Sequence, residues 1–554
     1  MATLTETASG LTTRHSILNG RDEAGAAGVR AAISPADGQP FAQASLLSAE
    51  QAGAAVEAAR AAFPAWSALP FRDRARYLLR ARDVLAERAE ELARLVTREQ
   101  GKPEAEAHAA EVLPALDALK HLALHSEDAL RDEEVESAVL VLAHKEGRLL
   151  QVPYGVVLVI SPWNYPLSLP LICVATALVA GNTVVLKPAP ATTLIGLEVG
   201  EIFRRAGVPP GVVNVVASDD AVAAGLVEDP RVGKIVFTGS VATGKKVMAA
   251  AAKNLTPVVL ELGGKDAAVV SRDADLDLAA QGIVWGAFLN AGQTCASVER
   301  VYVEAPVADA FVRKVVERTR ALRTGDPARS DTDMGPLTLE RQRRIVEDHV
   351  ADAVARGARV ETGGETPAGP GFFYPPTVLT NVTHEMRIMR EETFGPVLPI
   401  MAVPSLDEAI RLANQSEYGL TASGWTRDAE IARRLQRELE AGAVTINDCI
   451  SSFGEPAAPW GGFKQSGIGR THGLAGLREM VQLKYVTRDP ARAPKLWWYP
   501  YGEELRRLMG TAVRALHGTS AWARLKAQLA LVGSSRFRRR AGLARVAQNA
   551  DKML

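Results

Sequence analysis

Gly155-Val-Val-Leu-Val-Ile160 is the stretch that decides the fold, because it is a fully apolar run of residues that favour β-strands. Similar short runs follow at 183–186, 211–216 and 234–237, and helical patterns lie between them. Strands that are apolar on both faces and alternate with helices are typical of a parallel sheet covered on both sides. The sequence therefore predicts an α/β fold built from βαβ units.

Helical and strand-like patterns extend on both sides of this region. The apolar spacing predicts helices at about 48–66, 71–100, 105–132, 192–206, 307–322, 338–356 and 406–413. It predicts further strands at 139–143, 257–261, 300–303 and 444–447. The apolar window 167–186 contains Pro170, Gly181 and Asn182, so it fits a buried helix and strand better than a membrane span.

The composition excludes several classes of protein. The 554 residues contain 64 Lys and Arg against 64 Asp and Glu, so no overall field attracts nucleic acid. The three cysteines cannot form a disulfide framework and lack metal-ligand spacing, so we expect a reducing compartment and no metal. The first 28 residues lack the apolar core of a signal peptide, which favours a cytoplasmic protein.

Two short segments carry candidate catalytic groups. Gly292-Gln-Thr-Cys295 places a thiol at the end of a glycine-containing turn, and Glu261 lies in an apolar segment just before Gly263-Gly264. A thiol and a carboxylate in such settings suggest a nucleophile and a base. The alternative for Cys295 alone is a small buried hydrophobic residue.

A third segment, Thr238-Gly-Ser-Val-Ala-Thr-Gly-Lys-Lys246, joins a strand to a helix and is suited to an anion. It nearly matches a nucleotide-binding P-loop, but Lys246 occupies the place of the hydroxyl that binds Mg²⁺. A turn that needs glycine only for packing is the other interpretation.

Seven motifs in register resemble the aldehyde dehydrogenase superfamily, from about residue 30 to about 487. They are Pro162-Trp-Asn164, Lys187-Pro-Ala189, Phe237-Thr-Gly-Ser240, Glu261-Leu-Gly-Gly-Lys265, Gly292-Gln-Thr-Cys295, Glu392-Thr-Phe-Gly-Pro396 and Pro459-Trp-Gly-Gly-Phe-Lys464. The resemblance implies a Rossmann-like cofactor domain, an α/β catalytic domain and a small β oligomerisation element. The expected boundaries are 1–130 with 152–262, then 263–477, and 131–151 with 478–490, followed by a C-terminal extension at 491–554.

The resemblance also implies roles for single residues. Cys295 would attack the aldehyde, Asn164 and the Cys295 N–H would hold the oxyanion, and Glu261 would activate the water that hydrolyses the thioester. The implied contacts of NAD or NADP are Lys187, Gly239, Ser240, Glu392, Phe394, Trp163 and Gly263. Two other functions stay open: transfer of the thioester to coenzyme A, and a non-enzymatic scaffold or membrane adaptor that has kept the fold.

The chain departs from the family pattern at two positions. Pro190 stands where NAD-preferring relatives often carry Glu, so it offers no acceptor to the ribose and no charge against a 2′-phosphate. Thr471 stands where many relatives have a second Glu, which leaves Glu261 as the main candidate base.

The expected walls of the substrate tunnel are mostly apolar, and none of them is an Arg that could clamp a carboxylate. By register with the family, they are Tyr165, Leu169, Ile172, Leu289 and Phe453. These residues favour an apolar aliphatic or aromatic aldehyde.

The chain continues beyond a typical family ending. Residues 491–554 are rich in Arg and Leu, and the spacing predicts basic amphipathic helices. Such helices lie on a membrane surface or pack on the enzyme or a neighbouring subunit, and both alternatives stay open. The family resemblance further implies a homodimer or homotetramer.

Overall fold

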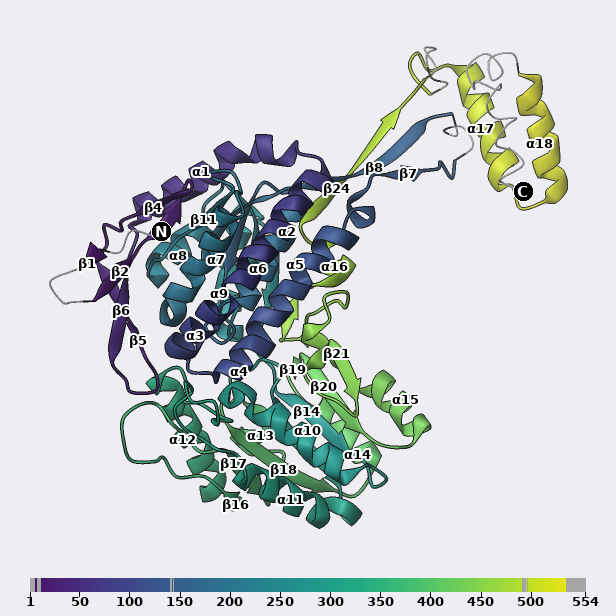
Figure 1. Cartoon of the computed structure of the whole chain (residues 1–554). Coiled ribbons are helices and arrows are strands. Elements are labelled where there is room, and N and C mark those ends of the chain that lie inside the picture. The colour runs from purple at the N-terminus through teal and green to yellow at the C-terminus, as the bar shows by residue number, and fades with distance from the viewer. Residues whose placement is uncertain are drawn as a thin grey trace. The chain divides into compact units, whose positions relative to one another are not determined.

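The computed structural model describes residues 5–6, 11–139, 142, 144–490, 495 and 497–534 (Figure 1). The chain divides into two compact units. Unit 1 comprises Met1–Leu130 with Pro153–Val481, and unit 2 comprises Arg131–Val152 with Gln482–Leu554. The four domain boundaries expected from the sequence stay a prediction.

The first large sheet of unit 1 has eight strands in the order β23-β13-β12-β9-β10-β11-β3-β4. Their bounds are Gly467–Ile468, Val258–Glu261, Val232–Thr238, Val156–Ile160, Thr183–Lys187, Val213–Val215, Ser16–Leu18 and Arg21–Glu23. The five strands from β13 to β11 run parallel. Along β9, Val157 and Val159 enter one core cluster while Val156 and Leu158 enter another. Both faces of this sheet are therefore buried, as the apolar run predicts.

Helices cover this sheet, and the predicted helical patterns fall on them. They are α1 Ala49–Ser67, α2 Phe71–Glu87, α3 Ala89–Gln100, α4 Glu104–Ala107, α5 Leu113–His125, α6 Ser168–Val179, α7 Thr193–Arg205, α8 Asp220–Val227 and α9 Val241–Ala251. A smaller sheet has the order β1-β2-β6-β5, with bounds Thr5–Glu6, Thr12–Arg14, Pro40–Ser45 and Val29–Ile33. The window 167–186 forms α6 and β10, which confirms the buried helix and strand.

The second large sheet has seven strands in the order β16-β17-β18-β15-β14-β20-β21. Their bounds are Arg359–Thr362, Thr377–Thr380, Val397–Val403, Val298–Glu304, Asp266–Val270, Thr421–Trp425 and Ala443–Ile446. Only β16 pairs antiparallel among the strands of this sheet that the structure describes. Its helices are α10 Leu276–Phe288, α11 Ala305–Arg320, α12 Glu340–Ala355, α13 Arg387–Arg390, α14 Leu406–Asn414 and α15 Ala429–Glu438. Shorter elements are α16 Gly473–Arg478 and the pair β19 Tyr418–Gly419 with β22 Phe463–Lys464.

Three sequence expectations differ from the structure. The helical region expected at 71–100 forms two helices, α2 and α3, which are separated at Arg88. The helix expected at 105–132 is interrupted by a π-helical turn at His108–Val112, which separates α4 from α5. The strand expected at 139–143 is wrong for the two of these residues that the structure describes. Val139 lies in a bend, and the Leu142 N–H donates to the Val139 backbone oxygen and closes a short turn. Residues 140, 141 and 143 lie outside the described part. An apolar run of five residues is too short to tell a strand from a turn.

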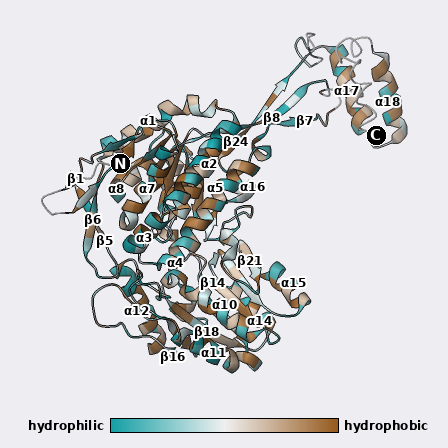
Figure 2. Ribbon diagram, in the orientation of Figure 1, coloured by the Kyte–Doolittle hydropathy of each residue, from teal (hydrophilic) through white to brown (hydrophobic). Residues whose placement is uncertain are grey.

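Unit 2 contains a three-stranded sheet and a pair of helices. The sheet has the order β24-β8-β7, with bounds Val481–Arg488, Glu146–Pro153 and Glu133–Val135. The helices are α17 Glu503–His517 and α18 Ala521–Gly533, and they pack on each other around Leu505, Leu508 and Leu531. Both show hydrophobic stretches between hydrophilic ones in Figure 2. Over the described ranges, no helix has the length and apolar character to cross a bilayer.

Candidate active site

The Cys295 loop begins where α10 ends, and its backbone is forced into an unusual shape. Asn290 and Ala291 both have φ of 54°, and Gly292 has φ of 72°. A Cβ added to Gly292 would lie 2.2 Å from the carbonyl oxygen of Gly395. Glycine is therefore required there for steric as well as backbone reasons. This contact joins the cysteine motif to the Glu392–Pro396 motif, about a hundred residues later.

The Cys295 thiol is partly buried, and its surroundings favour the protonated form over the thiolate. Burial raises the pKa of the thiol well above its usual range, and the negative charges of Asp266, Glu261 and Glu392 raise it further. A hydrogen bond from the Ala296 N–H acts in the opposite direction. Nucleophilic attack therefore requires a base to take the thiol proton.

Glu261 ends strand β13 and is 5% exposed. Its Oε1 lies 3.5 Å from the Thr471 hydroxyl, and within the described part of the chain its Oε2 has no hydrogen-bond partner. Burial raises the pKa of this carboxyl well above its usual range, against the opposing charge of Arg470. Burial makes the ionised form of this carboxyl a stronger base, and its unpartnered oxygen can accept a proton from a nearby thiol or water.

Asn164 lies in the loop between β9 and α6, and it is docked on the cysteine loop. Its Nδ2 donates to the backbone oxygen of Gln293 over 3.0 Å. Its own backbone oxygen accepts from Asn290 Nδ2 over 3.0 Å. The next residue, Tyr165, hydrogen-bonds Thr294 Oγ1 over 2.7 Å. The structure therefore docks the predicted oxyanion donor on the loop that carries the predicted nucleophile.

A buried ion pair that the sequence analysis missed stabilises the loop that carries Asn164. Lys102 Nζ lies 2.8 Å from Glu111 Oε1 and donates to the Asn164 backbone oxygen over 2.9 Å. Glu111 Oε2 accepts from the backbone N–H groups of Leu167 and Ser168, at the start of α6. In the sequence, Lys102 lies between two predicted helices and Glu111 lies on a helical segment, and both look like ordinary surface charges. Only the fold shows that both are buried.

A second buried ion pair that the sequence analysis missed stabilises the segment that carries Phe394, a predicted cofactor residue. Lys265 Nζ lies 2.6 Å from Glu299 Oε2, and Glu299 accepts from the backbone N–H groups of Thr393 and Phe394 over 2.8 Å each. Phe394 has φ of 52°, an uncommon value for an aromatic residue, and these hydrogen bonds stabilise it. Its ring meets the Trp163 ring edge-on, with centroids 5.4 Å apart.

Glu392 and the Gly263-Gly264 turn fit together closely. Glu392 Oε1 accepts from the Gly264 N–H over 3.0 Å. A Cβ on Gly263 would lie 2.3 Å from Glu392 Oε2, so only glycine leaves room for the carboxyl. Burial raises the pKa of Glu392 to about 8. This close fit brings the predicted cofactor residues Glu392 and Gly263 together.

The remaining predicted cofactor residues lie at or just beyond the carboxyl ends of β10 and β12, two parallel strands on either side of β9. Lys187 ends β10, and its Nζ lies 3.5 Å from Asp220 Oδ1. Gly239 and Ser240 follow β12, and Ser240 caps α9 by accepting from Thr243 N. A helix N-terminus and an ammonium group at this edge of a parallel sheet fit the pyrophosphate and ribose of a dinucleotide. These residues are therefore suited to NAD or NADP.

Aromatic rings connect two of the predicted tunnel walls. The Tyr165 and Phe453 ring centroids lie 6.3 Å apart, and Phe453 also meets Trp460 and His472 edge-on. The other three predicted walls are buried: Leu169, Ile172 and Leu289. His472 was missed by the sequence analysis. Burial lowers its pKa to about 4, so its imidazole is neutral at physiological pH.

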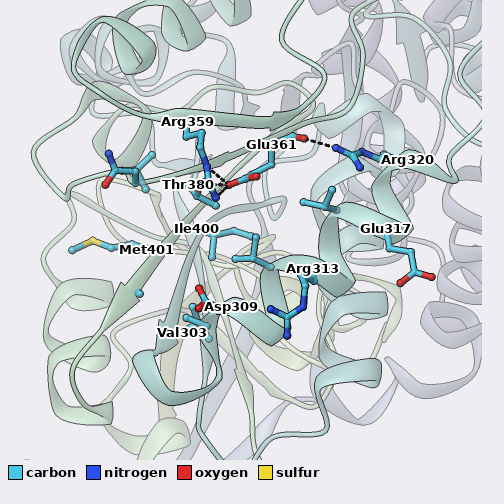
Figure 3. Close-up of a pocket in the computed structure, with 16 residues that line it drawn as sticks. Val303, Asp309, Arg313, Glu317, Arg320, Arg359, Glu361, Thr380, Ile400 and Met401 are labelled. Carbon is cyan, nitrogen blue, oxygen red and sulfur yellow. Dashed lines mark hydrogen bonds and ion pairs between the residues drawn. The ribbon is translucent and has the colours of Figure 1, made fainter.

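A surface groove of about 1060 Å³ lies between α11 and strands β16, β17 and β18 (Figure 3). None of the predicted site residues lines it. Three of its charged residues bind neighbours: Glu361 pairs with Arg359 and accepts from Thr380, and Arg320 donates to the Glu361 backbone oxygen. The groove is therefore separate from the Cys295 site, and these paired charges are not available to a ligand.

Comparisons with known proteins agree with this geometry. The model of the aldehyde dehydrogenase family matches residues 23–486. An aldehyde dehydrogenase of Paenarthrobacter nicotinovorans is 41% identical over 428 residues, covering 77% of this chain and 93% of that protein. A 4,4'-diapolycopene aldehyde oxidase of Methylomonas sp is 38% identical over 482 residues, covering 85% and 88%. The crystal structure of an NAD-dependent aldehyde dehydrogenase from Sinorhizobium meliloti has a TM-score of 0.84 and 36% identity, covering 88% of this chain and 97% of that one.

Proposed function

The chain belongs to the aldehyde dehydrogenase family and is an NAD(P)-dependent aldehyde dehydrogenase, and we propose that it works through a Cys295 thioester that Glu261-activated water hydrolyses. The observation that supports this mechanism best is the convergence of three groups. Asn164 docks on the loop of Cys295, and the Glu261 carboxyl is close enough to raise the pKa of the thiol. A nucleophile, an oxyanion donor and a base are the groups that acyl chemistry requires.

The first step forms a bond between Cys295 Sγ and the aldehyde carbon. The thiol proton passes to Glu261, and the carbonyl oxygen becomes an alkoxide that the Asn164 amide and the Cys295 N–H stabilise. Loss of one such donor costs about 3 kcal/mol of transition-state stabilisation. Bound NAD(P)⁺ supplies the hydride acceptor, and a thioester remains on Cys295.

The second step breaks the thioester. The proton that Glu261 took from the thiol first leaves to solvent. The ionised carboxylate then takes a proton from a water molecule, and the hydroxide adds to the acyl carbon to give a tetrahedral intermediate. Its C–S bond breaks as that proton passes to sulfur, which releases the carboxylic acid and the Cys295 thiol. The free Oε2 of Glu261 can accept that water proton without first breaking a hydrogen bond.

An apolar aliphatic or aromatic aldehyde is the substrate class that the predicted walls favour. Tyr165 and Phe453 are aromatic, with ring centroids 6.3 Å apart, and the other three walls are aliphatic. The Methylomonas relative is named for an aldehyde of 4,4'-diapolycopene. Pro190 opens the short turn after Lys187 and carries no acceptor, so we propose that the site admits NADP as well as NAD.

Assembly into a homodimer or homotetramer is part of the same proposal. Strand β24 forms an edge of the three-stranded sheet, and its Leu483 and Tyr485 are 64% and 57% exposed. An edge strand with exposed apolar side chains favours pairing with another chain. Light scattering of the purified protein measures the assembly directly.

The decisive experiment follows NAD(P)H formation over a panel of aldehydes, with both cofactors and with or without coenzyme A. Cys295→Ala should abolish turnover while cofactor binding persists, and Cys449→Ala, which removes another buried thiol, should keep turnover. Glu261→Gln should give one burst of NAD(P)H per site and then stall. An unchanged steady rate in Glu261→Gln would remove Glu261 from deacylation. Strict dependence on coenzyme A would replace hydrolysis by acyl transfer, and no NAD(P)H from any aldehyde would favour a scaffold.

A further inference from the structure

Helix α18 has two apolar faces on opposite sides. Ala527 and Leu531 are buried against α17. Trp522, Leu525, Leu529 and Val532 form a second stripe, with exposed fractions of 75%, 47%, 67% and 57%. Leu529 and Leu531 are two residues apart, which turns them by about 200° around the helix. Packing on α17 therefore leaves the second stripe, here called the outer stripe, uncovered.

Helix α17 carries exposed apolar residues of its own. On α17, Val513 is 61% exposed and Leu516 is 41% exposed. Exposed apolar residues that occur singly are normal, but a stripe at helical spacing indicates a binding surface. The family match ends at residue 486, so the aldehyde dehydrogenase fold does not account for this surface.

The charge of this part of the chain identifies the partner. Residues 503–554 carry eleven Lys and Arg against three Asp and Glu, while the whole chain is balanced. Lys526 and Arg524 lie on α18 itself and are exposed, and residues 535–554, outside the described part, add six of the eleven cations. Two copies of such a segment would repel each other, whereas an anionic surface attracts it.

We propose that the α17–α18 pair docks this enzyme on an anionic lipid bilayer, with the outer stripe inserted into the headgroup region and the cations near lipid phosphates. An apolar stripe that includes Trp, next to Lys and Arg, is the pattern of helices that lie in the membrane interface. The helices bind to the bilayer without crossing it.

The test is sedimentation of the purified full chain with vesicles of phosphatidylcholine, with and without phosphatidylglycerol. The stripe variant is Trp522→Glu with Leu529→Glu. The control variant is Ala523→Glu with Ala530→Glu, which adds the same charge at the neighbouring exposed positions, turned about 100° from the stripe residues. The stripe variant should bind anionic vesicles at least about tenfold more weakly than the control, because two side chains lose their apolar burial.

Wild-type binding should also weaken as salt rises and be much lower on pure phosphatidylcholine. Equal binding of the stripe and control variants overturns the proposal, as does equal binding to neutral and anionic vesicles. No wild-type binding, together with a smaller assembly in the stripe variant, would assign the surface to another protein chain instead. Equal melting curves by circular dichroism show that both variants fold.

Discussion

Helices α6 and α18 are similar in length and both rich in apolar residues, yet their surroundings are opposite. All twelve residues of α6, Ser168–Val179, are buried. Of the thirteen residues of α18, Ala521–Gly533, only Ala527 and Leu531 are buried. Helix α6 connects strands β9 and β10 of a parallel sheet, whereas α18 contacts one other helix.

The difference shows that apolar composition alone does not determine burial. Helix α6 is enclosed because the strands on either side of it belong to one sheet whose face it covers. Helix α18 has a single partner, so its second apolar face has nothing to cover it within unit 2 as described. Helix α6 therefore belongs to the core next to the candidate active site, whereas α18 exposes an apolar stripe on its surface.

The most severe test of this comparison places the same charge on each helix. Val174→Asp on α6 should abolish the folded state, because an unpaired carboxylate in the core costs several kcal/mol or more. Leu529→Asp on α18 should leave the melting temperature of the enzyme nearly unchanged. Expression level and differential scanning calorimetry measure both. Equal losses would mean that the outer stripe is part of the folded core.

The second test removes the carboxyl that caps α6. Glu111→Ala should destabilise the protein by about 3–5 kcal/mol, because Lys102 is left buried and unpaired and two backbone N–H groups lose their acceptor. Urea unfolding measures the free energy. Glu504→Ala on exposed α17 is the control and should cost less than about 0.5 kcal/mol. A small loss in Glu111→Ala would show that the buried pair contributes little.

The third test uses pH. Burial raises the pKa of Glu106 to about 7, above the 4.5 of an ordinary Glu, and Glu106 accepts from Asn290 N. Between these values the folded state holds a proton that the unfolded state has lost, so the stability contribution of this group falls as pH rises. As pH rises from 4.5 to 8, the free energy of unfolding of Glu106→Gln should therefore increase relative to that of wild type by up to about 3 kcal/mol. Urea unfolding at several pH values measures the gain, and a pH-independent difference would contradict the raised pKa.

Much of the fold could be read from local patterns. The runs at 156–160, 183–187 and 232–238 are strands, and the amphipathic spacing at 340–355 is a helix. The residue pattern did not predict strand β8 at Glu146–Pro153, because Glu146, Arg148 and Gln151 break its apolar spacing, and only the family resemblance implied a β element there. Its place is set by pairing with β7 on one side and β24 on the other.

Part of the candidate site could also be predicted. Cys295, Glu261 and Asn164 belong to motifs with particular residue types at particular spacings. Lys102 and Glu299 could not be predicted, because a Lys or Glu in a sequence is far more often solvated than buried. Their partners lie nine and thirty-four residues away, and nothing local identifies them.

The sequence by itself determined the alternation of strands and helices, the glycine turns, and the thiol, carboxyl and amide that carry the chemistry, because these depend on residue type and short spacing. Tertiary structure alone decided that Asn164 docks on Gln293, that Gly292 packs on Gly395, and that the outer stripe stays exposed. Those features depend on contacts between segments distant in the chain, or on the lack of such contacts among the described residues. Burial, and with it the pKa of each buried group, follows from those contacts.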